Sequence, residues 1–283
     1  MKGRVVKVET DKFTVIADEQ SIICPARKKV KLKSIVKVGD IVEIERDGDN
    51  FALSRICERK NVLIRPSVAN VDAVVMVLSP IPVPDYTLAD KMLINCAEKG
   101  IKCIICANKT DISQSFYDEI AFQYSSDAVV VSACAERGEV KNLRDAIKGK
   151  FVCMAGQSAV GKSSLINALV GKKVAASGTL SAIERGKNTT TKATLYALGN
   201  DTYVADTPGF GLLDVFDVAA DELDLYYSEY VAHSGKCRYH RCTHISEPDC
   251  EVKRLVETGK LSKARYDRYV KLFAELKNAK KTY

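Results

Sequence analysis

The segment from Gly156 to Ser163 has the residue types and spacing of a phosphate-binding loop. It reads Gly-Gln-Ser-Ala-Val-Gly-Lys-Ser and matches G-x-x-x-x-G-K-[ST]. Glycines let backbone N–H groups curl around phosphates, and a following helix adds the positive end of its dipole. In such a loop the lysine reaches the β- and γ-phosphates and the serine hydroxyl holds Mg²⁺. The residues predicted to hold the nucleotide here are Gly156, Gln157, Ser158, Ala159, Val160, Gly161, Lys162, Ser163 and Ser164.

A second motif could select the base of the nucleotide. Asn108-Lys109-Thr110-Asp111 has the pattern N-K-x-D, the guanine-reading box of GTPases. A carboxylate accepts from guanine N1–H and the N2 amino group, whereas a carboxylate facing adenine would be left unpaired. Ser132 and Ala133 end a later predicted strand, and we expect their backbone N–H groups to face guanine O6. These residues predict GTP, bound with Mg²⁺, rather than ATP.

Two polar segments after this loop are candidates for contact with Mg²⁺ and the γ-phosphate. Residues 186–191 read G-K-N-T-T-T, a candidate first switch in which one threonine, here taken as Thr190, completes the Mg²⁺ shell. Asp206-Thr207-Pro208-Gly209 fits D-x-x-G, which places a carboxylate near Mg²⁺ and a glycine N–H on the γ-phosphate. The candidate catalytic residues are Lys162, Ser163, Thr190, Asp206 and Gly209.

The chain has no evident group to orient the attacking water. In Ras-like enzymes a glutamine follows D-x-x-G and orients the water, but the residue here is Phe210. Asn188 cannot act as a general base, because an amide does not titrate. We therefore expect slow intrinsic hydrolysis, with a partner that completes the site.

Four potential metal ligands lie close together near the C-terminus. They are Cys237, Cys242, His244 and Cys250. Three thiolates and one imidazole close a tetrahedral Zn²⁺ site with no position for water, so the site would be structural. Reduced surface cysteines are the alternative, and His240 competes with His244 as the fourth ligand, although Cys242-x-His244 is the more compact pair. The prediction is one structural zinc per chain, which stabilises a segment too small to have its own core.

Composition limits the class of protein. The chain has 283 residues, 46% apolar residues, ten cysteines and a net charge of +7. No apolar segment follows Met1 to Arg4, and the apolar run 71–83 is broken by Asp72 and two prolines, so we expect a cytoplasmic protein without a membrane segment. Cysteines without a secretory signal indicate reduced thiols or a metal site. The positive charge suits a nucleic-acid partner but is weak evidence for one.

Residues 1–65 have the pattern of a small β-barrel. About five short runs of β-branched or alternating residues are separated by turn signals such as Gly39-Asp40. This spacing favours a five-stranded OB-fold. The basic stretch Arg27–Lys33 would lie in a loop between strands, where polynucleotide backbone commonly docks. A solvated charge run, or an edge strand protected by lysines, explains it equally well.

The middle of the chain alternates between apolar runs and helical patterns. Predicted strands at residues 71–78, 101–107, 128–132 and 151–155 alternate with helical segments. This alternation predicts a parallel, doubly wound sheet with ligands at the carboxyl ends of its strands. The guanine-reading box precedes the phosphate-binding loop, so the chain enters the GTPase fold at a different place, as in a circular permutation.

The C-terminal segment 262–281 has an amphipathic helical pattern. Tyr266, Tyr269, Phe273 and Leu276 share one face, which we expect to pack on the chain itself. Basic residues, including Arg265 and Arg268, dominate elsewhere. They would be solvated or would lie on phosphates, and the basic stretch in the first domain favours phosphates. The predicted domains are an OB-fold RNA-binding domain at 1–65, a circularly permuted α/β GTPase domain at 66–215, and a mainly helical zinc-binding domain at 216–283.

Together these features resemble the RsgA (YjeQ/YloQ) family of circularly permuted GTPases. The resemblance covers nearly the whole chain. It rests on the order of the GTPase boxes and on four segments: Glu58-Arg59-Lys60-Asn61 through Arg65-Pro66, Val68–Asp72, Asp206 to Phe210, and the Cys-x₄-Cys-x-His-x₅-Cys cluster. It implies GTP hydrolysis stimulated by the small ribosomal subunit, outer domains that contact rRNA, and a role late in assembly of that subunit. We expect a monomer.

One departure from the family pattern affects the first switch. Family members usually carry G-R-H-T-T-T, but Lys187 and Asn188 replace the arginine and histidine here. An rRNA-binding assembly factor that senses GTP or GDP without significant turnover is therefore an alternative function. A kinase-like enzyme that uses ATP is a third, against which Asn108 and Asp111 argue.

Overall fold

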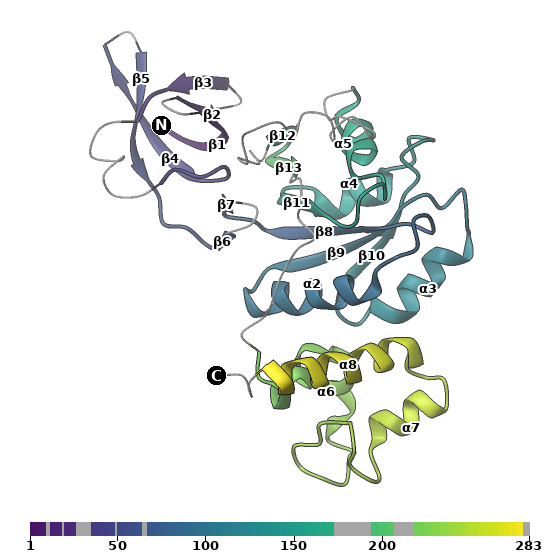
Figure 1. Cartoon of the computed structure of the whole chain (residues 1–283). Coiled ribbons are helices and arrows are strands. Elements are labelled where there is room, and N and C mark those ends of the chain that lie inside the picture. Colours follow the sequence, from purple (N-terminus) through teal and green to yellow (C-terminus); the bar gives the residue numbers. More distant parts are fainter. Residues whose placement is uncertain are drawn as a thin grey trace.

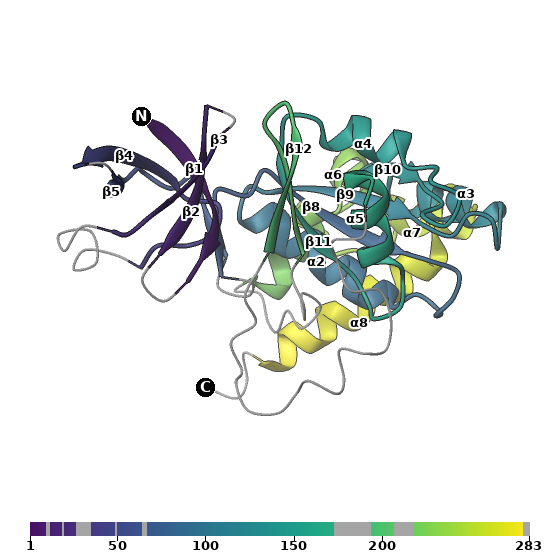
Figure 2. The same ribbon diagram turned by 90° about the horizontal axis from the view of Figure 1, so that it is seen from above.

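The computed structural model describes most of the chain as three parts in a row (Figures 1 and 2). The described residues are 1–9, 12–18, 20–26, 35–48, 50–63, 67–172, 194–206 and 218–279. A β-barrel lies beside a sheet covered by helices, and a helical region lies against the helices on one face of that sheet. The boundaries predicted at residues 65 and 215 fall outside the described residues and stay predictions.

The N-terminal part is a five-stranded antiparallel barrel. Its strands run in the order β3-β2-β1-β4-β5. The Leu53 N–H donates to the Pro25 carbonyl at 2.9 Å, and a bridge joins Ala26 to Leu53, so the two outer strands meet. This closed order is the predicted OB-fold. The basic stretch Arg27–Lys33 lies outside the described residues. The strands are β1 (Lys2–Val8), β2 (Phe13–Ala17), β3 (Gln20–Cys24), β4 (Ile41–Asp47) and β5 (Asn50–Ile56).

The central sheet has six strands in the order β10-β9-β8-β11-β13-β12. A short ribbon, β6 (Val62–Leu63) paired with β7 (Val68–Ala69), leads into it from the barrel. Five strands are parallel, which confirms that part of the prediction. The strands are β8 (Ala73–Leu78), β9 (Lys102–Ala107), β10 (Val129–Ser132), β11 (Phe151–Ala155), β12 (Thr194–Gly199) and β13 (Thr202–Asp206).

One edge of the sheet holds a strand, β12, that the sequence analysis did not predict. β12 runs antiparallel to β13 and is joined to it by Asn200 and Asp201, whose φ angles are 48° and 52°. A two-residue turn with positive φ at both positions forms a tight hairpin, which can join only antiparallel strands. The central sheet is therefore mixed.

Helices cover both faces of the sheet, as a doubly wound arrangement requires. One apolar core joins α2 (Tyr86–Glu98) and α3 (Ser115–Tyr124) to the first face. The other core joins α4 (Lys141–Ile147) and α5 (Lys162–Val170) to the second face. From β8 the chain builds the sheet toward β10, and from β11 it builds toward β13. The carboxyl ends of β8 and β11 therefore flank the topological switch point, where ligands bind in such sheets.

The C-terminal helical region packs beneath α2 and α3 (Figure 1). Tyr269 and Leu272 of its longest helix are fully buried, so the prediction that this helix packs on its own chain is confirmed. Within the described residues, no helix is long and apolar enough to cross a bilayer. The elements are the 3₁₀ helix η2 (Ala220–Tyr226), α6 (Ser228–Ser234), α7 (Glu251–Glu257) and α8 (Lys263–Ala279).

Candidate nucleotide and metal sites

The loop Gly156–Ser163, here called the phosphate loop, follows β11 and leads into α5. Its two glycines occupy positions that no other residue fits. Gly156 has φ +130°, and a Cβ there would lie 2.4 Å from the Val77 carbonyl oxygen. Gly161 has φ +98°, and a Cβ there would lie 2.3 Å from Nδ2 of Asn108. The loop therefore runs against its neighbours as bare backbone, which leaves its N–H groups accessible to an anion.

Lys162 is the first residue of α5, and its side chain turns back across the phosphate loop. Its Nζ donates to the carbonyl oxygens of Gly156, at 2.7 Å, and Gln157. Burial lowers the pKa of this ammonium, and the nearby Asp206 carboxylate opposes that shift. Ser163 and Ser164 follow in the first turn of the helix and are half-buried. The charge of the lysine is thus held next to the loop before any phosphate binds.

Asn108 links the base-reading box to the phosphate loop. It is buried, and its Nδ2 donates to the Val160 carbonyl at 2.9 Å while its Oδ1 accepts from the Ala135 N–H at 3.2 Å. Lys109 donates to the carbonyl oxygens of Ala159 and Ile81. The two predicted motifs, about fifty residues apart in sequence, are therefore held together at the carboxyl ends of β9 and β11.

Asp111 lies at the edge of an open cavity of about 650 Å³. Its Oδ1 accepts from the Cys134 thiol at 3.1 Å, and this hydrogen bond is the main reason that the pKa of Asp111 is lowered. The carboxylate is exposed and ionised, as base reading by an acceptor requires. The cavity is lined by Thr110, Asp111, Gln114, Tyr117, Asp118, Ser132, Arg137 and Glu139.

Of the two residues expected to meet guanine O6, Ser132 lines this cavity and Ala133 lines a neighbouring one. The Ser132 hydroxyl accepts from Nδ2 of Asn142 at 3.1 Å. The Ala133 N–H, however, donates to the Ala107 carbonyl at 2.8 Å, and the Ala133 carbonyl accepts from the Thr110 hydroxyl. The expected donor to O6 is therefore already engaged in the sheet, so a base contact from Ala133 would require that hydrogen bond to open.

Of the switch residues, only Asp206 is described. It ends β13, on the same edge of the sheet as the phosphate loop, and its carboxylate is close enough to act on the pKa of Lys162. Thr190 and the segment 186–191 lie outside the described residues, as do Thr207, Pro208, Gly209 and Phe210. Their predicted roles stay predictions.

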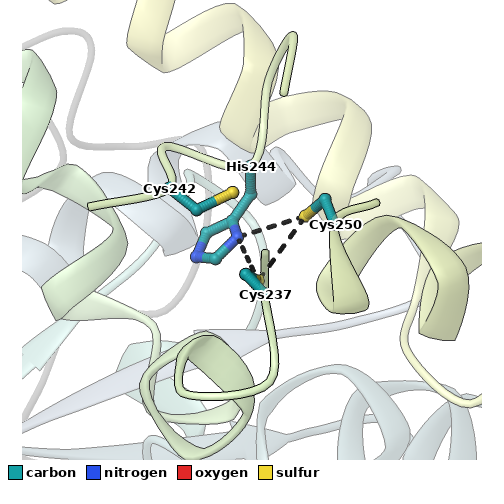
Figure 3. A group of neighbouring side chains, drawn as sticks. All are labelled: Cys237, Cys242, His244 and Cys250. Atoms are coloured by element: carbon teal, nitrogen blue, oxygen red, sulfur yellow. Dashed lines mark hydrogen bonds between the residues drawn. The ribbon is translucent and has the colours of Figure 1, made fainter. Parts of the chain in front are cut away.

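The four predicted metal ligands come together in the C-terminal region (Figure 3). Their donor atoms all lie within 4.8 Å of one another. His244 Nδ1 is 3.3 Å from the Cys250 Sγ and 3.7 Å from the Cys237 Sγ. Two sulfur ligands about 2.3 Å from one tetrahedral ion lie about 3.8 Å apart, so the cluster fits such an ion. His240 is exposed and is not part of the cluster, which supports the choice of His244.

Residues outside the cluster hold the loop that carries His244. The Glu247 carboxylate accepts from the Thr243 N–H and hydroxyl and from the N–H groups of Ile245 and Ser246. Burial alone would raise its pKa, but these hydrogen bonds lower it to about 2. The hydroxyls of Tyr266 and Tyr269 donate to the carbonyl oxygens of His244 and Thr243. The prediction from sequence missed Glu247, because its role depends on the folded turn.

Burial is the main influence on the protonation of the metal cluster. It raises the pKa of the Cys242 thiol to about 12 and lowers the pKa of His244. Thiols of this kind become ligands only when a cation replaces their protons. Three buried thiols around one buried imidazole are therefore a soft donor set that a divalent cation would stabilise.

Arg265 and Arg268 of α8 contradict the expectation that they lie on phosphates or in solvent. Arg265 is 1% exposed, and its Nη1 is 2.6 Å from the Asp127 Oδ2. Arg268 donates to Asp90, which is also buried, at 2.5 Å. Glu229 lies 3.6 Å from Arg265. These five residues form a largely buried ion cluster that joins α8 to α2, α6 and the segment between α3 and β10. The sequence pattern could not reveal it, because its members are distant in sequence.

The fold and the nucleotide site define the class of protein: a P-loop protein with GTPase motifs in circularly permuted order. The comparisons identify the family. The RsgA GTPase family model matches residues 56–216. The chain is 38% identical to a protein named small ribosomal subunit biogenesis GTPase RsgA from Ruminiclostridium cellulolyticum, over 82% of this chain and 78% of that one. A protein of the same name from Thermotoga neapolitana is 35% identical over 97% and 96%. The chain belongs to the RsgA GTPase family.

Solved structures agree with this assignment over nearly the whole chain. The crystal structure of YjeQ from Thermotoga maritima has a TM-score of 0.78 and 34% identity, covering 97% of this chain and 98% of that one. A structure described as YloQ, a circularly permuted GTPase, has a TM-score of 0.76 and 29% identity, covering 98% and 95%. The likeness therefore includes the N-terminal barrel and the C-terminal region as well as the central sheet.

Proposed function

We propose that this protein hydrolyses GTP and uses its nucleotide state to bind and leave the small ribosomal subunit during its biogenesis. The observation that carries the proposal is the link between base-reading and phosphate-binding motifs. Asn108 joins them through its hydrogen bond to the Val160 carbonyl at the switch point of the sheet. The names of the relatives supply the small subunit as partner.

Each residue of the predicted site has a role in this proposal. Asp111 accepts hydrogen bonds from guanine, and the phosphate loop together with Lys162 holds the phosphates. Ser163 and Asp206 would hold Mg²⁺; Thr190 and Gly209, which lie outside the described residues, would complete the Mg²⁺ shell and donate an N–H to the γ-phosphate. Mg²⁺ neutralises charge on the β- and γ-phosphate oxygens when it is bound. The chain itself orients the nucleotide and stabilises its charge.

Zinc is the metal that we propose for the Cys237 cluster. Three thiolates and one imidazole in a closed tetrahedral set suit Zn²⁺ and leave no position for a reacting water. The role of the ion is to hold the turn from Cys242 to Cys250 against α8. We also propose one ion per chain, a monomeric protein and a cytoplasmic location, where ribosomal subunits are assembled.

The small subunit is proposed to stimulate hydrolysis late in assembly. Phe210 cannot orient water, and Asn188 cannot act as a base, so the isolated chain should hydrolyse GTP slowly. A partner that orders the switches or donates a group can raise the hydrolysis rate strongly, since groups supplied in trans accelerate such reactions roughly 10³- to 10⁵-fold. Contacts between the outer parts and rRNA would bring that partner to the site.

Single-turnover GTP hydrolysis, titrated with purified small and large subunits, tests this function. We expect acceleration by small subunits and none by large ones. Fast hydrolysis by the isolated protein would contradict the partner-completed site. Saturable binding of GTP and small subunits with no acceleration would support the alternative function, an rRNA-binding factor that senses GTP or GDP without significant turnover.

A further inference from the structure

The imidazole of His244 presents only one of its nitrogens to the thiols. Nδ1 faces the cluster, at 3.3 Å from the Cys250 Sγ. Nε2 is buried on the other side of the ring and has no hydrogen-bond partner in the described part of the chain. A histidine that binds a metal through Nδ1 carries its proton on Nε2. The ring would therefore bury a donor that needs an acceptor.

Asp224 lies next to this unpartnered nitrogen. Its Oδ2 is 4.0 Å from Nε2, and its side chain is 15% exposed. The other acidic residues of η2, Asp221 and Glu222, point into solvent. The Glu247 carboxylate is on the ligand loop but already accepts from the backbone of that loop. Asp224 is thus the acidic group placed to accept from Nε2.

We propose that Asp224 positions His244 for metal binding by accepting the Nε2–H of its imidazole. This inference rests on the proposed zinc site and adds a residue that the ligand set does not contain. A buried N–H without an acceptor loses the hydrogen bond that it would make with water, which destabilises the buried state. A carboxylate acceptor removes that cost, fixes the tautomer and turns Nδ1 toward the thiolates. The present separation exceeds the hydrogen-bond limit of about 3.2 Å, so the contact forms as the ion fixes the ring.

A purely local role for Asp224 is the competing explanation. The Asp224 carboxylate also accepts from its own backbone N–H and that of Leu225, within η2. A residue that only stabilises this 3₁₀ helix would affect folding but not the tautomer of His244. The experiment must therefore measure the metal and the ring separately from the fold.

The test measures the zinc dissociation constant by chelator competition and, in zinc-loaded protein, the solvent exchange of the His244 Nε2–H proton by long-range ¹H–¹⁵N spectra. The variants are Asp224→Ala and Asp224→Asn, with Asp221→Asn as the matched control on the same element. We expect Asp224→Ala to weaken zinc binding about 10- to 100-fold and to speed the exchange of the Nε2–H proton, because that proton loses its acceptor. Asp224→Asn retains a neutral acceptor and should lose less, while Asp221→Asn should match the wild type.

The outcomes separate this inference from the zinc proposal. Wild-type protein without zinc, after preparation free of chelator, would overturn the zinc assignment and this inference with it. Zinc-loaded wild type, with unchanged zinc affinity and unchanged exchange of the Nε2–H proton in both Asp224 variants, would overturn only the inference. If Asp224→Ala does not fold by circular dichroism, Asp224→Asn decides the question, and unchanged zinc affinity in that variant would overturn the inference.

Discussion

The phosphate loop and the metal cluster differ in whether their polar groups have hydrogen-bond partners when no ligand is bound. Lys162, Asn108 and Lys109 all donate to backbone carbonyl oxygens around the phosphate loop. In the metal cluster, by contrast, the Cys242 pKa is raised to about 12 by burial, and His244 has a buried nitrogen without a partner. The first site is held together by its own hydrogen bonds, whereas the second needs a bound ion to stabilise its buried polar groups. Ligand loss should therefore leave the first folded and loosen the second.

Loss of the metal should have the largest effect. Binding of structural zinc contributes roughly 10 to 16 kcal/mol in small zinc domains, because it is coupled to folding. Cys242→Ser should therefore lose the ion and loosen the C-terminal region, while GTP still binds. Elemental analysis, hydrogen exchange of residues 218–279 and nucleotide titration measure the three effects. Cys57→Ser, at a half-exposed cysteine outside the cluster, should retain zinc.

Lys162→Ala should strongly lower the rate of GTP hydrolysis and should have little effect on the stability of the fold. The ammonium stabilises charge on the phosphates, so its loss should lower the hydrolysis rate by about 10³-fold or more, with and without small subunits. The melting temperature should stay close to that of the wild type. Lys172→Ala, an exposed lysine just after α5, is the control. A melting temperature that falls as far as that of Cys242→Ser would refute the contrast between the sites.

Arg265→Met tests whether charges hold the C-terminal region independently of the metal. This change leaves Asp127 and Glu229 buried without their main cation, and breaking a buried pair typically costs about 3 to 5 kcal/mol. Zinc-loaded protein should therefore unfold at lower denaturant concentration. Lys91→Met is the control, because Lys91 of α2 pairs with Glu275 of the same helix α8 at an exposed position. Its cost should be below about 1 kcal/mol, and equal costs would mean that the buried cluster adds nothing.

Asp111→Asn should change the choice of base rather than the scaffold. The amide replaces an acceptor with a donor, so guanine should bind about 10²-fold more weakly, and xanthine, which has a carbonyl in place of the N2 amino group, should bind better. Competition among GTP, XTP and ATP measures this. Asp118→Asn lines the same cavity and should retain the preference for GTP. Unchanged preference in Asp111→Asn would remove this residue from the base site.

Sequence alone predicted the parts of this protein whose signals are local. The strands of the central sheet are continuous apolar runs, and β11 was predicted with its observed bounds, Phe151–Ala155. The phosphate loop and the Cys237 cluster are short motifs, so their residues could be named without a fold. The roles of Thr190 and Gly209 stay predictions.

The features that sequence missed depend on residues brought together by folding. The sequence analysis missed the edge strand β12, because this strand has no strong apolar signal of its own. The turn Gly199-Asn200-Asp201 joins it to its hairpin partner β13. Arg265 and Arg268 were predicted to be solvated or to lie on phosphates, because their partners Asp90 and Asp127 lie far away in the chain. The Cys134 thiol that holds Asp111 also comes from a different strand end.

The ion cluster has a consequence for synthesis of the chain. Asp90 and Arg268 are separated by 178 residues. At roughly 5 to 20 residues per second, Asp90 leaves the peptidyl-transferase centre roughly 10 to 35 s before its partner is made. During that time its carboxylate must stay hydrated, because burying it alone would be costly. The face of α2 that carries Asp90 therefore stays hydrated while the nucleotide end of the sheet forms, and it is buried only when α8 docks onto it.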